Sequence, residues 1–305
     1  KKTVLKAIAT QQKLTATLQA AIITAATLQD VEDLYLPYKQ KKRTKAMIAR
    51  ENGLQPLADF VLTHLSEEIP TEAYINDALA DAAAVLAGLH EIIAEQIGEK
   101  AIYRQWLRER MQRDGFLTVT VKRDGEEKDA QGVYAQYYDY SESLKSLQMN
   151  TFRILAVNRG EKDGVLSVKI DFSEERMRHF IQIKERNGQG DSGEGYQVLL
   201  SAIDDAYKRF IQPAVARELR QELTVLAQGQ AIKVFGDNLY HLLMQAPLKN
   251  KIVMGFDPGF RTGSKLAIID ANGRFLKKEV IYPHKPASEK QRQEAAKRFQ
   301  SLIHE

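Results

Sequence analysis

The chain has 305 residues, which suggests two or three domains and is long enough to bury a core without covalent staples. Hydrophobic residues make up 44% and charged residues 28%, a balance that excludes collagen-like, wholly disordered and membrane-embedded proteins. The absence of cysteine excludes disulfides, thiol catalysis and cysteine-ligated zinc. The net charge is only +4, so any nucleic-acid surface must come from local clustering of cations.

The two ends of the sequence indicate part of a longer protein. Residues 1–10 lack the long apolar segment of a secretory signal, and no apolar run approaches the roughly 18–20 residues of a membrane span. Residues 290–305 are typical of a helix and stop without a cap. We therefore expect a fragment that does not contact a membrane.

Residues 1–115 predict an alanine- and leucine-rich helical region. Within it, Thr44 is suited to cap a helix that Gly53 ends, and a long helical pattern runs from Thr71 to Gly115. A short aromatic helix is predicted at 131–140. Two short strands are predicted next, at 152–157 and 165–170, with a glycine-containing turn between them.

The second half of the chain predicts long helices and then a change of period. Helical spacing runs over 196–228, where Pro213 is expected to kink or break the helix, and another helix is predicted at about 229–245. Three strands follow, at 252–256, 265–270 and 275–282, with an Asn272-Gly273 hairpin turn. We therefore expect a helical region at 1–246, with a small strand pair at 152–170, and the start of an α/β domain at 250–305.

Three glycines, Gly188, Gly190 and Gly193, match the dinucleotide-binding pattern G-x-G-x-x-G by letter. That pattern requires a buried strand before it and a helix after it. Residues 178–186 are instead charged and helical, and Asp191 and Glu194 would repel a pyrophosphate. A flexible linker between helices is the interpretation that fits.

Six cations and no acid lie within the thirteen residues 38–50. Such a cluster contacts phosphates by displacing condensed counterions, and it precedes a helix N-terminus, which also favours anions. A solvated basic turn is the alternative. The candidate nucleic-acid-binding residues are Lys39, Lys41, Lys42, Arg43, Lys45 and Arg50.

Three tyrosines, Tyr134, Tyr137 and Tyr138, stand at helical spacing, with Tyr140 close by. Tyrosine rings stack on unpaired bases, but the same spacing is more typical of a helix face packed against a core. We therefore predict a packing role.

The turn Asp257-Pro-Gly-Phe-Arg-Thr-Gly263 lies between two predicted strands. A strand that ends in Asp-x-Gly and leads into a hairpin opens RNase H-type folds, and also actin-like ATPases and sugar kinases. Asp257 is placed to hold a divalent ion, Gly259 and Gly263 permit a sharp turn near a ligand, and Arg261 suits a phosphate. A structural turn with an exposed aspartate is the alternative.

Taken together, the sequence resembles the bacterial transcription accessory protein family Tex, and the Asp257 turn resembles that family's YqgF-type, RNase H-like domain. The supporting stretches are residues 32–39, 43–53, 159–166, 202–209, 234–239 and 257–263. The resemblance implies a cytoplasmic, nucleic-acid-binding protein acting in transcription, with RNA or DNA and the transcription machinery as partners. It also implies a helical N-terminal region with a helix-turn-helix-like part. The family's RNA-binding barrel is absent from this sequence.

We expect this chain to bind and not to catalyse. Two-metal hydrolysis requires several carboxylates, and this sequence supplies Asp257 alone, since Asp270 is better placed to serve its hairpin turn. Neither a metal ion nor a cofactor is expected. The alternatives are a metal-dependent nuclease or resolvase using Asp257, and an ATPase-type fold, which would need a second phosphate loop.

Overall fold

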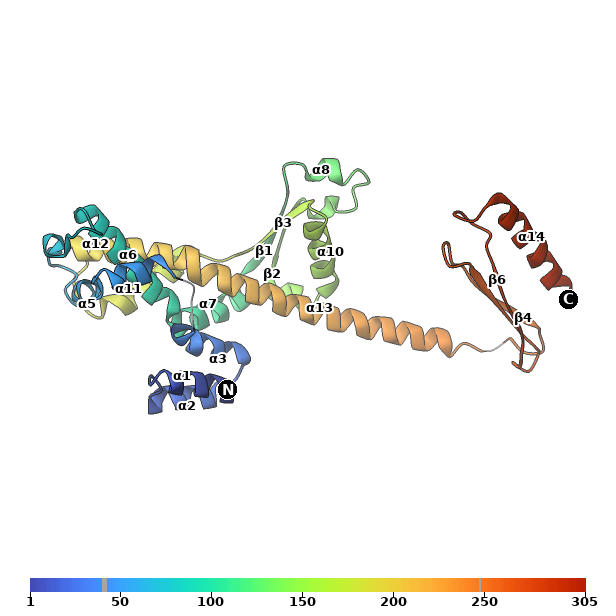
Figure 1. The fold of residues 1–305 in the computed structure, drawn as a ribbon, viewed down its shortest axis with the longest axis horizontal. Coiled ribbons are helices and arrows are strands. Elements are labelled where there is room, and N and C mark those ends of the chain that lie inside the picture. Colours follow the sequence, from blue (N-terminus) through green and yellow to red (C-terminus); the bar gives the residue numbers. More distant parts are fainter. Residues whose placement is uncertain (40–42, 247) are drawn as a thin grey trace. The chain divides into compact units, whose positions relative to one another are not determined.

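A computed structural model describes residues 1–39, 43–246 and 248–305 (Figure 1). It divides into two compact units, residues 1–233 and 234–305, and each is treated by itself. The predicted fold class is confirmed: the chain is mainly helical, with two small antiparallel sheets. In the described ranges, no helix has the length and apolar character needed to span a bilayer.

The first unit begins with three short helices that share a small core of their own. Ile8, Ile22 and Val31 are buried together in it. Threonine caps begin the second and third helices, because the Thr15 and Thr27 hydroxyls accept the backbone N–H groups of Leu18 and Asp30. The helices are α1 (Lys2–Thr10), α2 (Ala16–Thr24) and α3 (Leu28–Tyr35).

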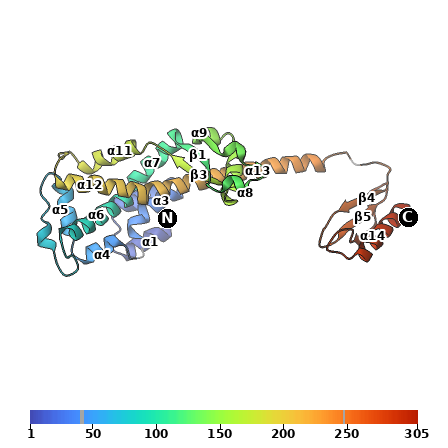
Figure 2. The same cartoon turned by 90° about the horizontal axis from the view of Figure 1, so that it is seen from above.

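The main core of this unit is built around α6 (Ala82–Glu99), which packs against three other helices. Its Leu89, Ile93 and Ile97 are fully or almost fully buried. Figures 1 and 2 both show this group of helices at one end of the unit. The helices that pack on α6 are α4 (Lys45–Glu51), α5 (Gln55–Thr63) and α12 (Glu194–Asp205), while α7 (Ala101–Asp114) and α11 (Glu174–Arg186) contribute further residues to the same core.

A three-stranded antiparallel sheet takes the place of the predicted strand pair. Its order is β2-β1-β3, from β1 (Phe116–Val121), β2 (Asp139–Ser143) and β3 (Leu166–Asp171). The strand predicted at 165–170 is β3, but the one predicted at 152–157 is wrong, because those residues belong to helix α10 (Thr151–Lys162). Thr151, Ile154, Val157 and Gly160 are its buried positions, and their spacing of three is a helical one.

The helix predicted at 131–140 is also wrong for most of its length. Only Ala135–Tyr137 forms a 3-10 turn, and β2 starts at Asp139. That prediction depended only on the spacing of Tyr137 and Tyr138, which stand three and four residues after Tyr134. The alternation of buried Leu117 and Val119 in β1 is a strand signal that the sequence did contain. Two further short helices flank the sheet, α8 (Gly125–Lys128) and α9 (Leu144–Leu147).

Pro213 does not break the helix that contains it. A π-helical segment, Ala206–Ile211, joins α12 to α13 (Gln212–Leu243), so helix continues from Glu194 to Leu243. The wide π turn immediately before Pro213 makes room for the proline ring. It also accommodates the hydrogen bond that is lost because proline has no backbone N–H. The helix predicted at 229–245 is the continuation of α13.

The second unit contains a sheet of order β4-β5-β6 with one helix packed on it. The three predicted strands are confirmed as β4 (Val253–Asp257), β5 (Ser264–Ile269) and β6 (Phe275–Ile281), and the helix is α14 (Glu289–His304). Leu266, Ile281, Ala295 and Leu302 form its small core.

Candidate nucleic-acid interface

The basic segment, residues 39–45, connects a 3-10 turn (Leu36–Tyr38) to helix α4. Lys39, Arg43 and Lys45 are exposed, while Lys41 and Lys42 lie outside the described residues. Thr44 caps α4 as predicted, and its hydroxyl accepts the Met47 N–H at 3.1 Å. The Met47 N–H is therefore already hydrogen-bonded. The attraction of residues 39–45 for anions depends on their cationic side chains.

Two of these cations make ion pairs that leave them accessible. Arg43 contacts Glu51 at 2.6 Å, with both side chains more than half exposed, and Lys45 Nζ lies 3.6 Å from Glu91. An exposed pair such as Arg43–Glu51 contributes only about 0–1 kcal/mol, and Lys45 is itself exposed at a longer distance from its partner, so a phosphate can compete for either cation.

Arg50 differs from the rest of the predicted cluster. Its guanidinium donates to the Glu95 carboxylate at 2.6 Å and to the Gln55 side chain at 2.9 Å. The Glu95 side chain is only 7% exposed. This pairing between α4 and α6 gives Arg50 a structural role, because a buried carboxylate needs its cation.

The Asp257 turn lies at the end of β4, and the aspartate is exposed. In the sheet register Asp257 pairs with Lys265. Arg261 is exposed as well. No group of three or more histidine or acidic side chains within the described ranges is arranged to hold a metal ion. Asp270 serves the hairpin as predicted, accepting the N–H groups of Asn272 and Arg274 at 2.9 and 2.8 Å.

The two glycines of that turn are needed by the fold itself. A Cβ on Gly259 would lie 2.4 Å from the Gly263 carbonyl oxygen. Gly263 has a φ of +84°, and a Cβ there would lie 2.8 Å from the Tyr282 and Val280 side chains. Close packing within the turn therefore accounts for both residues without a ligand.

The glycine-rich stretch at 188–193 is a linker between α11 and α12, and it is held against α5 and the residues after it. Gln189 donates to the Leu62 carbonyl at 2.9 Å and accepts the Leu65 N–H at 3.0 Å. Glu194 accepts the Ile69 N–H at 3.0 Å. Helix α11, and not a strand, leads directly into it, so the context of a dinucleotide site is missing.

The tyrosines pack as predicted. Tyr134 and Tyr137 are buried in the main core. The Tyr134 hydroxyl donates to Asp163 at 2.5 Å, and the Tyr138 hydroxyl donates to Asp129 at 3.0 Å. Rings held in this way are not free to stack on bases.

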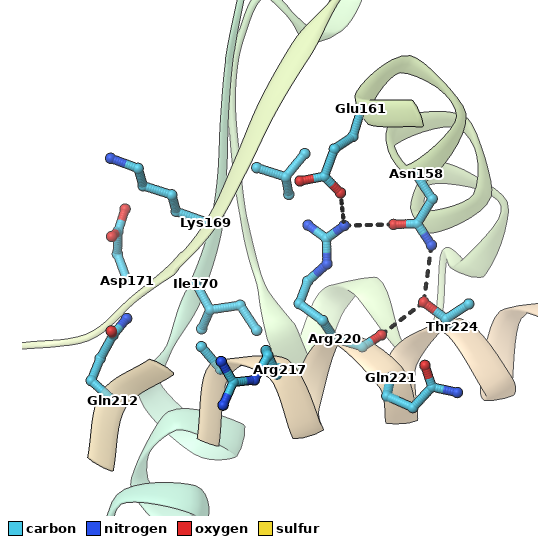
Figure 3. Close-up of a pocket in the computed structure, with 12 residues that line it drawn as sticks. Asn158, Glu161, Lys169, Ile170, Asp171, Gln212, Arg217, Arg220, Gln221 and Thr224 are labelled. Atoms are coloured by element: carbon cyan, nitrogen blue, oxygen red, sulfur yellow. Dashed lines mark hydrogen bonds and ion pairs between the residues drawn. The ribbon is translucent and has the colours of Figure 1, made fainter. Parts of the chain in front are cut away.

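The structure also reveals a groove that the sequence did not indicate (Figure 3). It has a volume of about 500 Å³ and lies between β3 and the first half of α13, with α10 at one side. Arg217 and Arg220 project from α13, and Lys169 comes from β3. Arg217 and Arg220 are three residues apart and therefore share a helix face. In a helix with many charged residues, this spacing alone is only a weak indication of a binding groove.

Comparisons with known proteins place both units in one family. The profile described as "Tex central region-like" matches residues 64–235, and "Tex protein YqgF-like domain" matches residues 251–305. The chain is 40% identical over 298 residues to the uncharacterized protein YdcI of Bacillus subtilis, covering 94% of this chain and 40% of that protein.

Two other relatives carry informative names. The transcriptional accessory protein Tex of Neisseria gonorrhoeae is 34% identical over 93% of this chain, which spans 38% of its length. The human S1 RNA-binding domain-containing protein 1 is 30% identical over 89% of this chain, which spans 28% of its length. This chain therefore belongs to the Tex family, with residues 64–235 matching its central region and residues 251–305 matching its YqgF-like domain.

Proposed function

We propose that this chain is the part of a Tex-type transcription accessory protein that binds the backbone of RNA or DNA through residues 39–45. The observation that supports this proposal is the exposure of Lys39, Arg43 and Lys45 on the short connection between α3 and α4. The sequence adds Lys41 and Lys42 to the same connection.

Contacts of this kind give affinity without sequence preference. A cation that meets a phosphate releases condensed counterions, so the affinity falls with salt in proportion to the number of contacts. A protein reads base sequence through contacts to the base edges inside a groove of the nucleic acid. Exposed lysines and an arginine on a short connection are placed to contact phosphates and not base edges. We expect a non-specific contact that positions the protein on a strand already engaged elsewhere.

The test is fluorescence anisotropy of the 305-residue chain with labelled single-stranded RNA and duplex DNA across a salt series. The variant combines Lys39→Glu, Lys41→Glu and Lys42→Glu, which spares the Arg43–Glu51 and Lys45–Glu91 pairs. A matched control combines Lys251→Glu, Lys290→Glu and Lys297→Glu, three exposed lysines with the same change of net charge.

We expect the first variant to weaken binding at least tenfold at low salt and to lower the salt slope by about 3 on duplex DNA. The control should retain most of the affinity. Equal losses in the two variants would mean that net charge alone drives binding. No binding by the unaltered chain would remove residues 39–45 from the proposal.

We further propose that this region acts without catalysis. Asp257 has no cluster of acidic partners within the described residues, and hydrolysis by paired metal ions needs several carboxylates. Incubation with Mg²⁺ or Mn²⁺ and labelled single-stranded, duplex and junction substrates should give no cleavage. Cleavage that Asp257→Ala abolishes would establish the nuclease alternative.

A further inference from the structure

The groove between β3 and α13 has an unpaired sheet edge as one wall. In the order β2-β1-β3, strand β3 pairs with β1 on one side only. The Lys122 N–H donates to the Val165 carbonyl at 2.8 Å, and Leu166 pairs with Val121 in the register. Hydrogen bonding alternates along an antiparallel strand, so Val168 and Ile170 direct their backbone N–H and C=O groups away from β1.

Both of these outward-facing residues line the groove. No backbone hydrogen bond outside the sheet ladders involves Val168 or Ile170 in the part of the chain that the structure describes. An open edge of this kind is a template for another strand. Gln212 and Thr224, which line opposite ends of the α13 wall, are twelve residues apart. That distance is about 18 Å along a helix, enough for an extended segment of about five residues.

Cations stand along the α13 wall and the rim (Figure 3). Arg220 donates from one terminal nitrogen to Asn158 at 2.8 Å and to Glu161 at 2.6 Å. Its other terminal nitrogen is buried without a hydrogen-bond partner. Arg217 and Lys169 are exposed, and neither makes an ion pair with any described residue. A carboxylate brought into the groove would therefore meet two cations, Arg217 and Lys169, that are not already paired with a described acid.

Two features favour a peptide over a nucleic acid as the occupant. Glu161 and Asp171 line the same groove and would repel a run of phosphates, whereas a peptide can place single carboxylates between them. The alternating donors and acceptors of a strand edge match another peptide backbone, and a sugar–phosphate backbone offers no N–H groups to pair with the carbonyls.

We propose that an extended, acidic segment of a partner protein binds in this groove, adding to β3 as a fourth strand and directing carboxylates to Arg217 and Lys169. This site is separate from residues 39–45 and does not depend on nucleic-acid binding there.

The absence of cysteine makes the site testable by disulfide capture on the full 305-residue chain. Gln221→Cys places one thiol on the exposed rim of the groove. The probe is a seven-residue peptide in which pairs of valines alternate with pairs of glutamates, so that an extended strand presents carboxylates on both faces. It carries an added cysteine and is offered under reversible thiol exchange. Captured peptide is measured by mass spectrometry. Ser141→Cys is the matched control, since Ser141 is exposed on the other free edge of the sheet, on β2.

We expect capture at position 221 to exceed capture at position 141 by about tenfold or more. Lysine in place of glutamate in the peptide should remove that preference, as should Lys169→Glu with Arg217→Glu in the protein. Lys122→Glu with Arg123→Glu, two exposed cations outside the groove, should leave it intact. Equal capture at positions 141 and 221 would overturn the proposal.

Backbone methylation separates strand addition from simple charge attraction. An added strand bonds to β3 through every second amide only. Of two peptides, one N-methylated at the odd-numbered positions and one at the even-numbered positions, one should be captured like the parent and the other about tenfold less. Equal behaviour of the two would overturn strand addition. Displacement of the captured peptide by single-stranded RNA, undiminished by the Lys39→Glu, Lys41→Glu, Lys42→Glu substitutions, would assign the groove to nucleic acid instead.

Discussion

Arg108 is the buried cation that joins three helices of the first unit. Its guanidinium donates to Asp33 of α3 at 2.6 Å and to Glu218 of α13 at 2.9 and 3.0 Å. Burial would lower the pKa of Arg108, but these two carboxylates raise it. Burial raises the pKa of Glu218, although Arg108 opposes that effect. The N-terminal helices, which have an apolar core of their own, are thus tied to the main core through buried charge.

Arg108→Ala should lower the free energy of unfolding by about 3–5 kcal/mol, because it leaves two carboxylates facing each other with their shared cation removed. Urea unfolding followed by Trp106 fluorescence measures this change. Arg113→Ala is the control, since Arg113 is 62% exposed in its pair with Asp114 and its loss should change the free energy of unfolding far less. Similar losses in the two variants would contradict the structural role of Arg108.

The carboxyl group of Glu142 makes the stability of the β2-β1-β3 sheet depend on pH. Burial tends to raise the pKa of Glu142, but hydrogen bonds from Ser146, Tyr140 and Arg153 outweigh it and lower the pKa. A carboxyl whose pKa is lowered in the folded state adds stability above its unfolded pKa, and that stability is lost as pH falls through the folded value.

Glu142→Gln should therefore destabilise the chain at pH 7, and the difference from the unaltered protein should shrink as the pH falls below about 4. Urea titrations at a series of pH values measure it. Glu126→Gln, an exposed carboxylate near the same sheet, serves as the reference. A difference that stays constant from pH 7 to pH 3 would show that the charge of Glu142 is not the cause.

At the scale of elements, the connection between α11 and α12 shows why one glycine of the false nucleotide motif is indispensable. Gly193 has φ +103° and ψ 168°, a region open only to glycine. A Cβ there would lie 2.7 Å from Ser66 Cα. Gly188 also has a positive φ, +83°, but nothing lies within 4 Å of its missing Cβ.

Gly193→Ala should consequently cost about 3 kcal/mol or more, and Gly188→Ala about 1 kcal/mol. Thermal unfolding of the two variants provides the comparison. Neither variant should differ in binding of a dinucleotide, because the unaltered chain should bind none. Equal unfolding temperatures in the two variants would mean that the α12 N-terminus moves away from Ser66 at little cost.

At the scale of the whole molecule, the two units differ in how much apolar surface they bury. The first unit has an extended core, whereas the core of the second consists of Leu266, Ile281, Ala295 and Leu302 with a few half-buried neighbours. Small cores give marginal stability. The single tryptophan, Trp106, belongs to the first unit and stacks on Phe180.

Urea unfolding should therefore give different curves by two probes. Far-ultraviolet circular dichroism should show an early transition, with a slope of about 1 kcal/mol/M, that tryptophan fluorescence does not follow. Leu266→Ala should move only the early transition, and Leu89→Ala only the later one. Coincident curves by both probes would mean that the two units unfold as one.

Local chemistry explains which predictions were confirmed. The Thr44 cap, the Asp270 turn and the three strands after residue 250 depend on neighbouring residues, so their signals are complete within a few positions. The strand predicted at 152–157 was wrong because β-branched and aromatic residues there suit a strand locally, and only packing of Ile154 and Val157 into the core selects a helix.

The sequence by itself determined the mainly helical class, the change of period near residue 250, the family, and a cation-rich connection at 39–45. Only the tertiary structure separated Arg50 from the other cations of the predicted cluster, because its partner Glu95 lies 45 residues away on another helix. It alone also placed the open edge of β3 beside Arg217 and Arg220, since a groove between elements far apart in the chain leaves no local pattern to read.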